Sequence, residues 1–348
     1  MQVLIPTLEK KLHPYLKEIS LFSKYGFING RLEDVNEDIK IINVHWPEAI
    51  FGWSEPTEEE LDRLEMQISE CKKTAKLVYT KHDYLRNKGT TKNFTRLFKI
   101  IEENSDAFIH LGEKSKSIYQ KLYPSAIHTR IYHPLFKNTF QTFTKEEARN
   151  TLGIQKDAFV IIVPGQIRTH KERDMILKAF KGLEFKKRQK VLIATNMRTE
   201  LRYDFPGRVR LKPFFDFQNF FKERFKGSHT PPTFYFNYSH LDEKEYSLRF
   251  SASDMVLIPR INILNSGNIF LGLALNKIVV GPGIGNMEEI LKQNGLPVFN
   301  PDSHRSIKSA IEEGIKLSNS KEFEFSNTHE YDPEIIAREY DDFLKSLL

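Results

Sequence analysis

The chain has 348 residues, of which 40% are hydrophobic and 28% charged, a composition of soluble globular proteins that argues against disorder or a fibrous structure. This length exceeds the usual size of one core and predicts two domains. A balance of 52 Lys+Arg against 46 Asp+Glu gives a net charge of +6, which permits anionic partners without identifying one.

Cysteine usage and hydropathy narrow the setting of the protein. The single cysteine, Cys71, excludes an internal disulfide and a cysteine-based metal cluster, and it is in keeping with a reducing cytoplasm. The opening segment becomes charged too early for a signal peptide, and no apolar run reaches the length of a membrane span. We therefore expect a cytoplasmic protein, with peripheral contact at the inner face of the membrane as a further hypothesis.

In the first part of the chain, short apolar runs alternate with helix-length segments. The helix over residues 57–71 has the clearest start, because Thr57 and Glu60 form a capping box. The strand candidates are Val3–Ile5, Ile41–Val44, Leu77–Tyr79, Ala107–Ile109 and Thr129–Ile131. This alternation predicts a doubly wound α/β domain over residues 1–140.

A basic and aromatic run, residues 85–100, allows two interpretations. It combines Arg86, Lys88, Lys92, Arg96 and Lys99 with Phe94, Leu97, Phe98 and Ile100. Laid on an anionic membrane, the charges would contact headgroups while the apolar side entered the interface. In the other interpretation the apolar side packs on the first domain, and both can hold together.

A second doubly wound domain is predicted over residues 141–331. A capping box at Thr144 starts its first helix, and the strand candidates are Phe159–Val163, Val191–Ala194, Met255–Ile258 and Ile278–Val280. Residues 203–236 interrupt the pattern with a crowd of phenylalanines, which we interpret as an insertion carrying a helix. The final segment, residues 332–348, begins at Asp332-Pro333 and predicts a helix with one apolar stripe.

Polar side chains gather at four places where predicted strands end. These places are Asn43–Glu48, Tyr79–Asp83, Gly165–Lys171 and the helix start around Ser266. In open α/β sheets ligands bind at the carboxyl ends of the strands, so two such edges that face each other predict a cleft between the domains. A phosphate is the natural ligand of the free amides at the Asn265–Asn268 helix start.

On these segments, together with residues 105–110 and 253–285, the sequence resembles bacterial glycosyltransferases of the GT-B fold, of the family 4 type that extends exopolysaccharides. The resemblance covers most of the chain and omits only residues 203–236. It implies two Rossmann-like domains around a cleft, with residues 332–348 crossing back to the first domain. It also implies transfer of a hexose from a nucleotide-diphosphate sugar to a glycan or lipid-linked acceptor, without a divalent metal. The absence of any Asp-x-Asp pair agrees with the last point.

The resemblance assigns donor-binding roles to residues of the second domain. Lys171 occupies the lysine of the family's Gly-Arg-x-x-x-x-Lys signature, Gln166 stands at its arginine, and Arg168 is the displaced candidate for the second cation. A cation pair suits a diphosphate leaving group whose charge grows in the transition state. The proposed donor site comprises Gly165, Arg168, Lys171, Asn265, Ser266, Gly267, Asn268, Glu288 and Glu289.

This chain departs from the family where two glutamates normally bind the donor. Ile263 and Leu271 occupy these positions, eight residues apart. Glu288 or Glu289, at the start of the next helix, would then partly substitute. Each is equally well explained as an ordinary acid in the first turn of a helix.

Candidates for activation of the acceptor lie at strand ends of the first domain. An inverting enzyme needs a carboxylate or histidine base beside the acceptor hydroxyl, whereas a retaining enzyme can depend on positioning. The candidates are Asp83, His82, His45 and Glu48, with His110 nearby. Asp83 and His82 are favoured because adjacent strand-end groups can share one site.

The expected partners are a nucleotide-sugar donor and a glycan or lipid-linked acceptor; no cofactor, metal or nucleic acid is expected. A nucleotide-sugar epimerase of similar two-domain architecture is an alternative, which would release its product without an acceptor. A non-catalytic protein that binds a glycan or nucleotide sugar is another, motivated by the missing glutamates.

Overall fold

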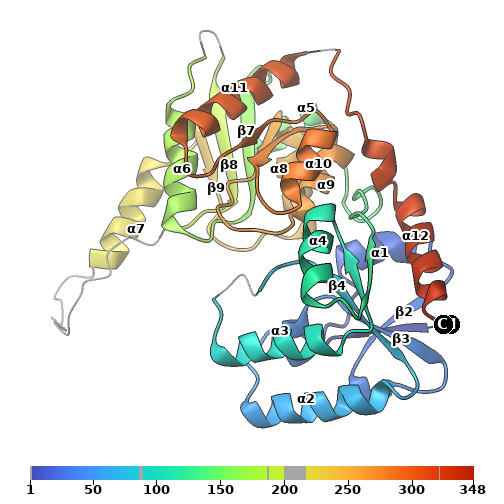
Figure 1. The fold of residues 1–348 in the computed structure, drawn as a ribbon. Helices are drawn as coiled ribbons and strands as arrows, with labels where there is room; N and C mark the ends of the chain where they lie inside the picture. Colours follow the sequence, from blue (N-terminus) through green and yellow to red (C-terminus); the bar gives the residue numbers. More distant parts are fainter. Residues whose placement is uncertain (1, 86–88, 186–187, 200–216, 321) are drawn as a thin grey trace.

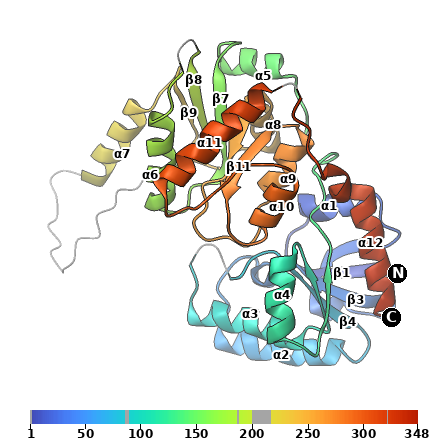
Figure 2. The same ribbon diagram turned by 45° about the horizontal axis from the view of Figure 1, so that its top comes forward.

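The computed structural model describes residues 2–85, 89–185, 188–199, 217–320 and 322–348. It contains two six-stranded parallel sheets, each flanked by helices, which confirms the predicted pair of doubly wound domains (Figure 1). The two sheets lie in separate layers joined by the segment after β6 (Figure 2).

The first sheet has the strand order β2-β1-β3-β4-β5-β6. Its elements are β1 (Gln2–Pro6), α1 (Pro14–Ser20), β2 (Gly26–Gly30), η1 (Leu32–Asp34), β3 (Ile39–Val44), η2 (Pro47–Phe51), α2 (Glu58–Cys71), β4 (Lys76–Lys81), α3 (Lys92–Asn104), β5 (Ala107–His110), α4 (Glu113–Leu122) and β6 (Ile127–Arg130). The order reverses between β1 and β3, so the topological switch point of this domain lies between them.

The second sheet has the order β12-β11-β10-β7-β8-β9, with its switch point between β7 and β10. Its elements are α5 (Lys145–Leu152), β7 (Phe159–Gln166), α6 (His170–Lys181), β8 (Lys190–Asn196), α7 (Phe217–Ser228), β9 (Phe234–Phe236), α8 (Glu243–Ala252), β10 (Met255–Leu257), α9 (Gly267–Ala274), β11 (Ile278–Pro282), α10 (Met287–Gln293), β12 (Val298–Phe299) and α11 (His304–Asn319). The chain ends with η3 (Thr328–Tyr331) and α12 (Pro333–Ser346).

Three sequence expectations need correction. α1 and β2 were not expected, because Pro14–Ser20 is short and Gly26–Gly30 carries only two apolar side chains in a glycine-bounded run. β6 starts two residues before the expected strand, at Ile127. Residues 234–236 pair with β8 as an edge strand, so the end of the expected insertion belongs to the sheet; residues 203–216 lie outside the described residues.

One hydrophobic core runs through both domains. Alternate residues of β1, Val3 and Ile5, face a cluster that continues into the second domain, whereas Leu4 faces a second cluster closed by α2 and α3. This alternation follows from the two-residue period of a strand. The side of the first sheet that carries Val3 and Ile5 is therefore covered by α1 and α12.

The position of α3 shows where the apolar side of the basic and aromatic run, residues 85–100, lies. Phe94, Leu97 and Phe98 are buried against the first domain, as the packing interpretation requires. Arg96 forms ion pairs with Glu58, Asp62 and Glu65 of α2. The exposed side of α3 is thus charged and partly neutralised by its neighbour.

α12 lies against the first domain, beside α1 (Figure 1). Ile336, Tyr340 and Leu344 are fully buried along its inner stripe. The Asp341 carboxylate accepts hydrogen bonds from the Ser23 hydroxyl at 2.5 Å and the Lys24 amide at 2.7 Å. The last helix is therefore joined to the first domain by both apolar and polar contacts.

Candidate functional site

The turn between β7 and α6 lies at the switch point of the second sheet. Gly165 has a φ of +75°, and a Cβ there would lie 3.3 Å from Arg260 Nη2 and 3.5 Å from Asn268 Nδ2. Its amide donates to Thr195 Oγ1 at 2.7 Å. A side chain at Gly165 would thus both strain the backbone and crowd two polar groups of the neighbouring loops.

A buried ion pair holds this turn in place. Arg260 follows β10, and its Nη1 donates to the Gln166 carbonyl at 2.9 Å and to Glu172 Oε2 at 3.1 Å. Both side chains are almost fully buried. The same Glu172 oxygen accepts from the Arg168 amide at 2.6 Å. Because the arrangement satisfies several donors together, the Arg260 and Glu172 pair fixes the path of the loop.

Arg168 is half-buried within this group. Burial and the neighbouring Arg260 lower its pKa, whereas Asp83 and Glu172 act in the opposite direction. Asp83 belongs to the first domain, directly after His82, whose carbonyl accepts a hydrogen bond from Asn265 of the second domain. The structure therefore brings the segment that carries the acceptor-side candidates His82 and Asp83 to the donor-side candidate Asn265.

Lys171 lies apart from this group. It is on the first turn of α6, is more than half exposed, and pairs with Asp302 at 2.5 Å. Its ammonium group binds Asp302, in the loop after β12, whereas Arg168 and Arg260 lie beside Gly165.

The loop before α9 contacts the first domain directly. Asn265 Nδ2 donates to the His82 carbonyl at 2.7 Å and the Lys81 carbonyl at 3.3 Å. A Cβ on Gly267 would lie 3.3 Å from His133 Nε2, and Ser266 is the N-cap residue without a side-chain cap. Asn268 Oδ1 accepts from the Tyr246 hydroxyl at 2.6 Å. Within the described residues, Asn265 thus binds backbone of the first domain.

A second asparagine extends this contact. Asn286 is fully buried and its Nδ2 donates to Asn265 Oδ1 at 2.8 Å and to Ser115 Oγ at 3.0 Å. Its Oδ1 accepts from the Ser115 amide at 3.0 Å. The side chains of Asn265 and Asn286 therefore connect the loop before α9 to α4 and to the end of β4.

The two α10 glutamates have different surroundings. Glu289 accepts from the Glu113 amide and from the Tyr132 hydroxyl, each at 2.8 Å, so both oxygens contact the other side of the domain boundary. Glu288 is partly exposed and pairs with Lys292 at 2.6 Å. Ile263 and Leu271, which stand where the resembling family has glutamates, are buried in the core.

His45 and His82 form a pair at the end of β3 and β4. His45 Nδ1 and His82 Nε2 lie 3.0 Å apart, and the Trp46 ring stacks on His82. Burial lowers the pKa of His45 to about 3 and that of His82 well below its ordinary value. Both imidazoles are therefore neutral at physiological pH, when one ring donates to the other.

The other acceptor-side candidates from the sequence are Glu48 and His110. Glu48 is buried on η2, after β3. His110, on β5, forms a separate 3.0 Å hydrogen bond with His128. His133 also joins the buried ring cluster through Tyr15, and the exposed His13 contacts the Trp46 ring; neither was expected.

Sequence reasoning missed Arg260, Glu172 and Asn286. A signal was present for Arg260, since it is a charged residue directly after an apolar strand at the switch point. Asn286 carried no such signal, because its partners Asn265 and Ser115 come from distant parts of the sequence.

A cavity of about 280 Å³ opens at the ends of β1 and β2 in the first domain, beside its switch point. Thr7, Gly30, Phe51 and Arg63 are among its lining residues. Among the described residues, no group of three or more His, Cys, Asp or Glu side chains is arranged to hold a metal ion. Nor does that part of the chain contain a helix long and apolar enough to cross a membrane.

No protein-family model matches the sequence, and no curated protein matches it. The architecture, two parallel-sheet domains with carboxyl edges meeting at their boundary, is the GT-B fold of glycosyltransferases.

Several solved structures share this fold. Anabaena HepE in complex with UDP has a TM-score of 0.65 at 14% identity, covering 99% of this chain and 100% of that one. A glycosyltransferase from Rickettsia africae gives 0.62 at 12% identity, covering 99% and 97%. Sucrose-phosphate synthase from Thermosynechococcus elongatus gives 0.61 at 13% identity, covering 89% and 74%. These TM-scores establish the shared fold, and at identities this low the comparison shows the fold alone.

Proposed function

We propose that this protein is a glycosyltransferase that moves a hexose from a nucleotide-diphosphate sugar to a glycan or lipid-linked acceptor in polysaccharide biosynthesis, of the family 4 type. The observation that carries the proposal is the position of Arg168 and Arg260 beside the Gly165 turn, at the domain boundary where Asn265 binds the backbone of His82, the residue before Asp83. HepE, which shares the fold, was solved with UDP and with UDP-glucose.

The donor diphosphate is assigned to the second domain. Two guanidinium groups beside a glycine turn and the start of α9 supply charge and amide donors to phosphate oxygens. Arg168 then stabilises the charge that grows on the leaving diphosphate, and Arg260 holds the loop that presents it. The proposed reaction uses no divalent metal and no cofactor, since these cations take the role of the metal.

The acceptor is assigned to the first domain, with Asp83 as the group that touches its hydroxyl. A carboxylate can accept the hydroxyl proton in an inverting transfer, or orient the acceptor in a retaining one. The neutral His82 and His45 pair supports the loop that carries Asp83. The cavity at the ends of β1 and β2 is where further units of the acceptor would bind.

The proposal places the protein in the cytoplasm, at the inner face of the membrane when the acceptor is lipid-linked. The charged outer side of α3 would meet anionic headgroups, without insertion of the buried Phe94 and Leu97.

The first test is nucleotide binding by the intact protein. We expect Arg168→Ala to weaken the binding of nucleoside diphosphates by about ten- to a hundredfold, the value of a charge-assisted hydrogen bond. Isothermal titration with UDP, ADP and GDP would measure it. Arg188→Ala is the matched control, because Arg188 is an exposed arginine of the same domain that contacts only Asn319 among the described residues. Equal affinities for all three proteins would refute the donor site.

A non-catalytic sugar-nucleotide binder is the second candidate, favoured by the burial of Ile263 and Leu271 at the family's glutamate positions. Incubation with nucleotide sugars and a panel of acceptors separates the two. Consumption of a donor only when an acceptor is present supports the transferase. Binding without consumption favours the second candidate, and acceptor-free formation of an epimerised sugar would instead indicate an epimerase.

A further inference from the structure

A small polar cavity lies in the second domain near the start of β11. Its volume is about 190 Å³, and Lys145, Asp254, Asn276, Lys277 and Ser320 are among the lining residues. It is at the amino ends of β10 and β11, so it is separated by the length of the sheet from the Arg168 and Arg260 group at the carboxyl ends.

Lys277 is the distinctive group of this cavity. Its Nζ donates to the Ser253 carbonyl at 2.8 Å and the Ser251 carbonyl at 3.1 Å, at the end of α8. Within the described part of the chain it has no carboxylate within ion-pair distance. An ammonium has three protons, so one donor remains after these two bonds.

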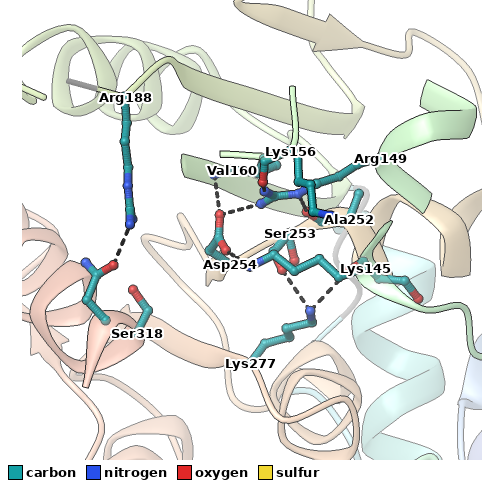
Figure 3. Close-up of polar contacts among 12 residues, drawn as sticks. Lys145, Arg149, Lys156, Val160, Arg188, Ala252, Ser253, Asp254, Lys277 and Ser318 are labelled. Atoms are coloured by element: carbon teal, nitrogen blue, oxygen red, sulfur yellow. Dashed lines mark hydrogen bonds and ion pairs between the residues drawn. The ribbon is translucent and has the colours of Figure 1, made fainter. Parts of the chain in front are cut away.

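The nearby charges leave an excess of positive charge. Asp254 is shared between Arg149, at 2.7 Å, and Lys145, and it also accepts from the Val160 amide at 2.7 Å. Figure 3 shows Arg149 and Lys145 reaching Asp254 from one side while Lys277 approaches the Ser253 backbone from another. The surroundings of the cavity therefore hold three cations, Arg149, Lys145 and Lys277, and one carboxylate, which is already paired with the first two.

Lys277 is partly buried, and partial removal of an unpaired cation from water is unfavourable unless a counter-charge is supplied. The pKa of Lys277 reflects this, since burial first and Lys145 second lower it to about 8. Two polar side chains of the cavity could also contact a ligand. The side chain of Asn276 makes no hydrogen bond within the described residues. The Ser320 hydroxyl accepts a hydrogen bond from the Glu322 amide, so its own proton remains available to donate. Ammonium, amide and hydroxyl donors around a positive cavity suit a tetrahedral oxyanion.

We propose that this cavity is a binding site for a phosphate group, from inorganic phosphate or from a small phosphorylated metabolite. The phosphate oxygens accept from Lys277, Asn276 and Ser320, and the dianion balances the excess charge. The site is independent of the proposed donor site.

Thermal unfolding of the intact protein provides the binding test. Phosphate is titrated at constant ionic strength with chloride, and glycerol 3-phosphate forms a second arm. We expect saturating phosphate to raise the midpoint by about 2 °C or more. Lys277→Gln should abolish the increase. Lys316→Gln should retain it, because Lys316 is an exposed lysine near the end of α11, the helix end that borders the cavity. A larger effect of glycerol 3-phosphate than of phosphate would identify the metabolite as the source.

Arg168→Gln separates this site from the donor site. Loss of the phosphate effect in Arg168→Gln together with its persistence in Lys277→Gln would overturn the proposal, and so would the absence of any phosphate effect. Binding of nucleoside diphosphates is measured separately, so a failure of the donor site leaves this result unaffected.

A measurement on the wild-type chain avoids any folding defect of the variant. Lysines are acetylated with a mild reagent at pH 8, and modified positions are quantified by mass spectrometry. We expect phosphate to reduce modification of Lys277 at least about threefold, while Lys316 is unchanged. Equal modification of Lys277 with and without phosphate would contradict the proposal.

Discussion

Buried histidines make the folded state sensitive to acid. Burial is the largest effect that lowers the pKa values of His45, His110 and His133 to about 3. Because these pKa values are lower in the folded state, the unfolded chain binds more protons below pH 6.5. The free energy of unfolding therefore falls as the pH decreases from about 6.5 towards 3.

His110 offers a direct test of this linkage. It is fully buried on β5 and lies outside the Asp83 group. One such histidine contributes about 1.4 kcal/mol per pH unit to the slope between pH 6 and 4. We expect His110→Gln to reduce the slope by about this amount in urea unfolding at pH 6, 5 and 4. The exposed His304→Gln should not change it, and identical slopes for His110→Gln and wild type would contradict the assignment.

Among the elements, the start of α4 packs tightly against the second domain. A Cβ on Gly112 would lie 2.6 Å from Asn286 Cγ and 2.7 Å from its Cβ, near the root of a buried side chain. The Gly112 backbone is extended and accepts any residue, so the lack of space alone requires glycine.

Gly112→Ala should therefore separate the domains at this contact. We expect a loss of about 1–3 kcal/mol in stability and a larger radius of gyration in solution scattering, because overpacking displaces Asn286 from Ser115 and Asn265. Gly227→Ala is the control, since a Cβ there meets nothing within 4 Å in α7. An unchanged scattering profile for Gly112→Ala would show that the domains do not need this contact.

The segment between the domains is anchored on α1 by one carboxylate. Glu18 is fully buried and accepts from the amides of Asn138 and Thr139, each at 2.8 Å, and from both of their side chains. Four donors on one carboxylate fix the path of the segment that follows the first domain.

Removal of this carboxylate leaves buried donors without partners. We expect Glu18→Ala to destabilise the protein by about 2–4 kcal/mol, measured by urea unfolding. The exposed Glu37→Ala should change the free energy of unfolding by less than about 0.5 kcal/mol. A similar small change for Glu18→Ala would mean that the segment finds other partners.

For the molecule as a whole, the last helix, α12, packs against the first domain although it follows the second domain in the chain. Asp341 of α12 binds the Ser23 and Lys24 region of the first domain, and the inner stripe of the helix is fully buried. Through η3 and the preceding segment, the same helix is connected to the second domain.

Asp341→Ala should cost about 2 kcal/mol in the free energy of unfolding, and deletion of residues 332–348 should cost more, because the deletion also exposes the apolar stripe. Asp342→Ala provides a matched control, since this neighbouring carboxylate is exposed. Calorimetry of the three variants would measure these effects. Wild-type stability of the truncated chain would contradict a structural role of the docked helix.

The sequence by itself determined the fold class and most strands. Apolar runs such as Phe159–Val163 and Ala107–Ile109 are buried on both faces of parallel sheets, so their hydrophobicity reveals them without neighbours. The capping boxes at Thr57 and Thr144 are local interactions, and both form as expected. Short or weakly apolar elements such as α1 and β2 lacked a signal of this kind.

Only the tertiary structure decided which polar residues meet. Gly165 and Arg168 were recognisable as strand-end groups, but their approach to Arg260 depends on the strand order that places β10 beside β7. The exposed position of Lys171 and the interdomain bonds of Asn265 and Glu289 depend equally on the docking of the two domains. Local sequence fixes strand ends because its forces act between near neighbours, whereas a site across a boundary depends on contacts between residues far apart in the chain.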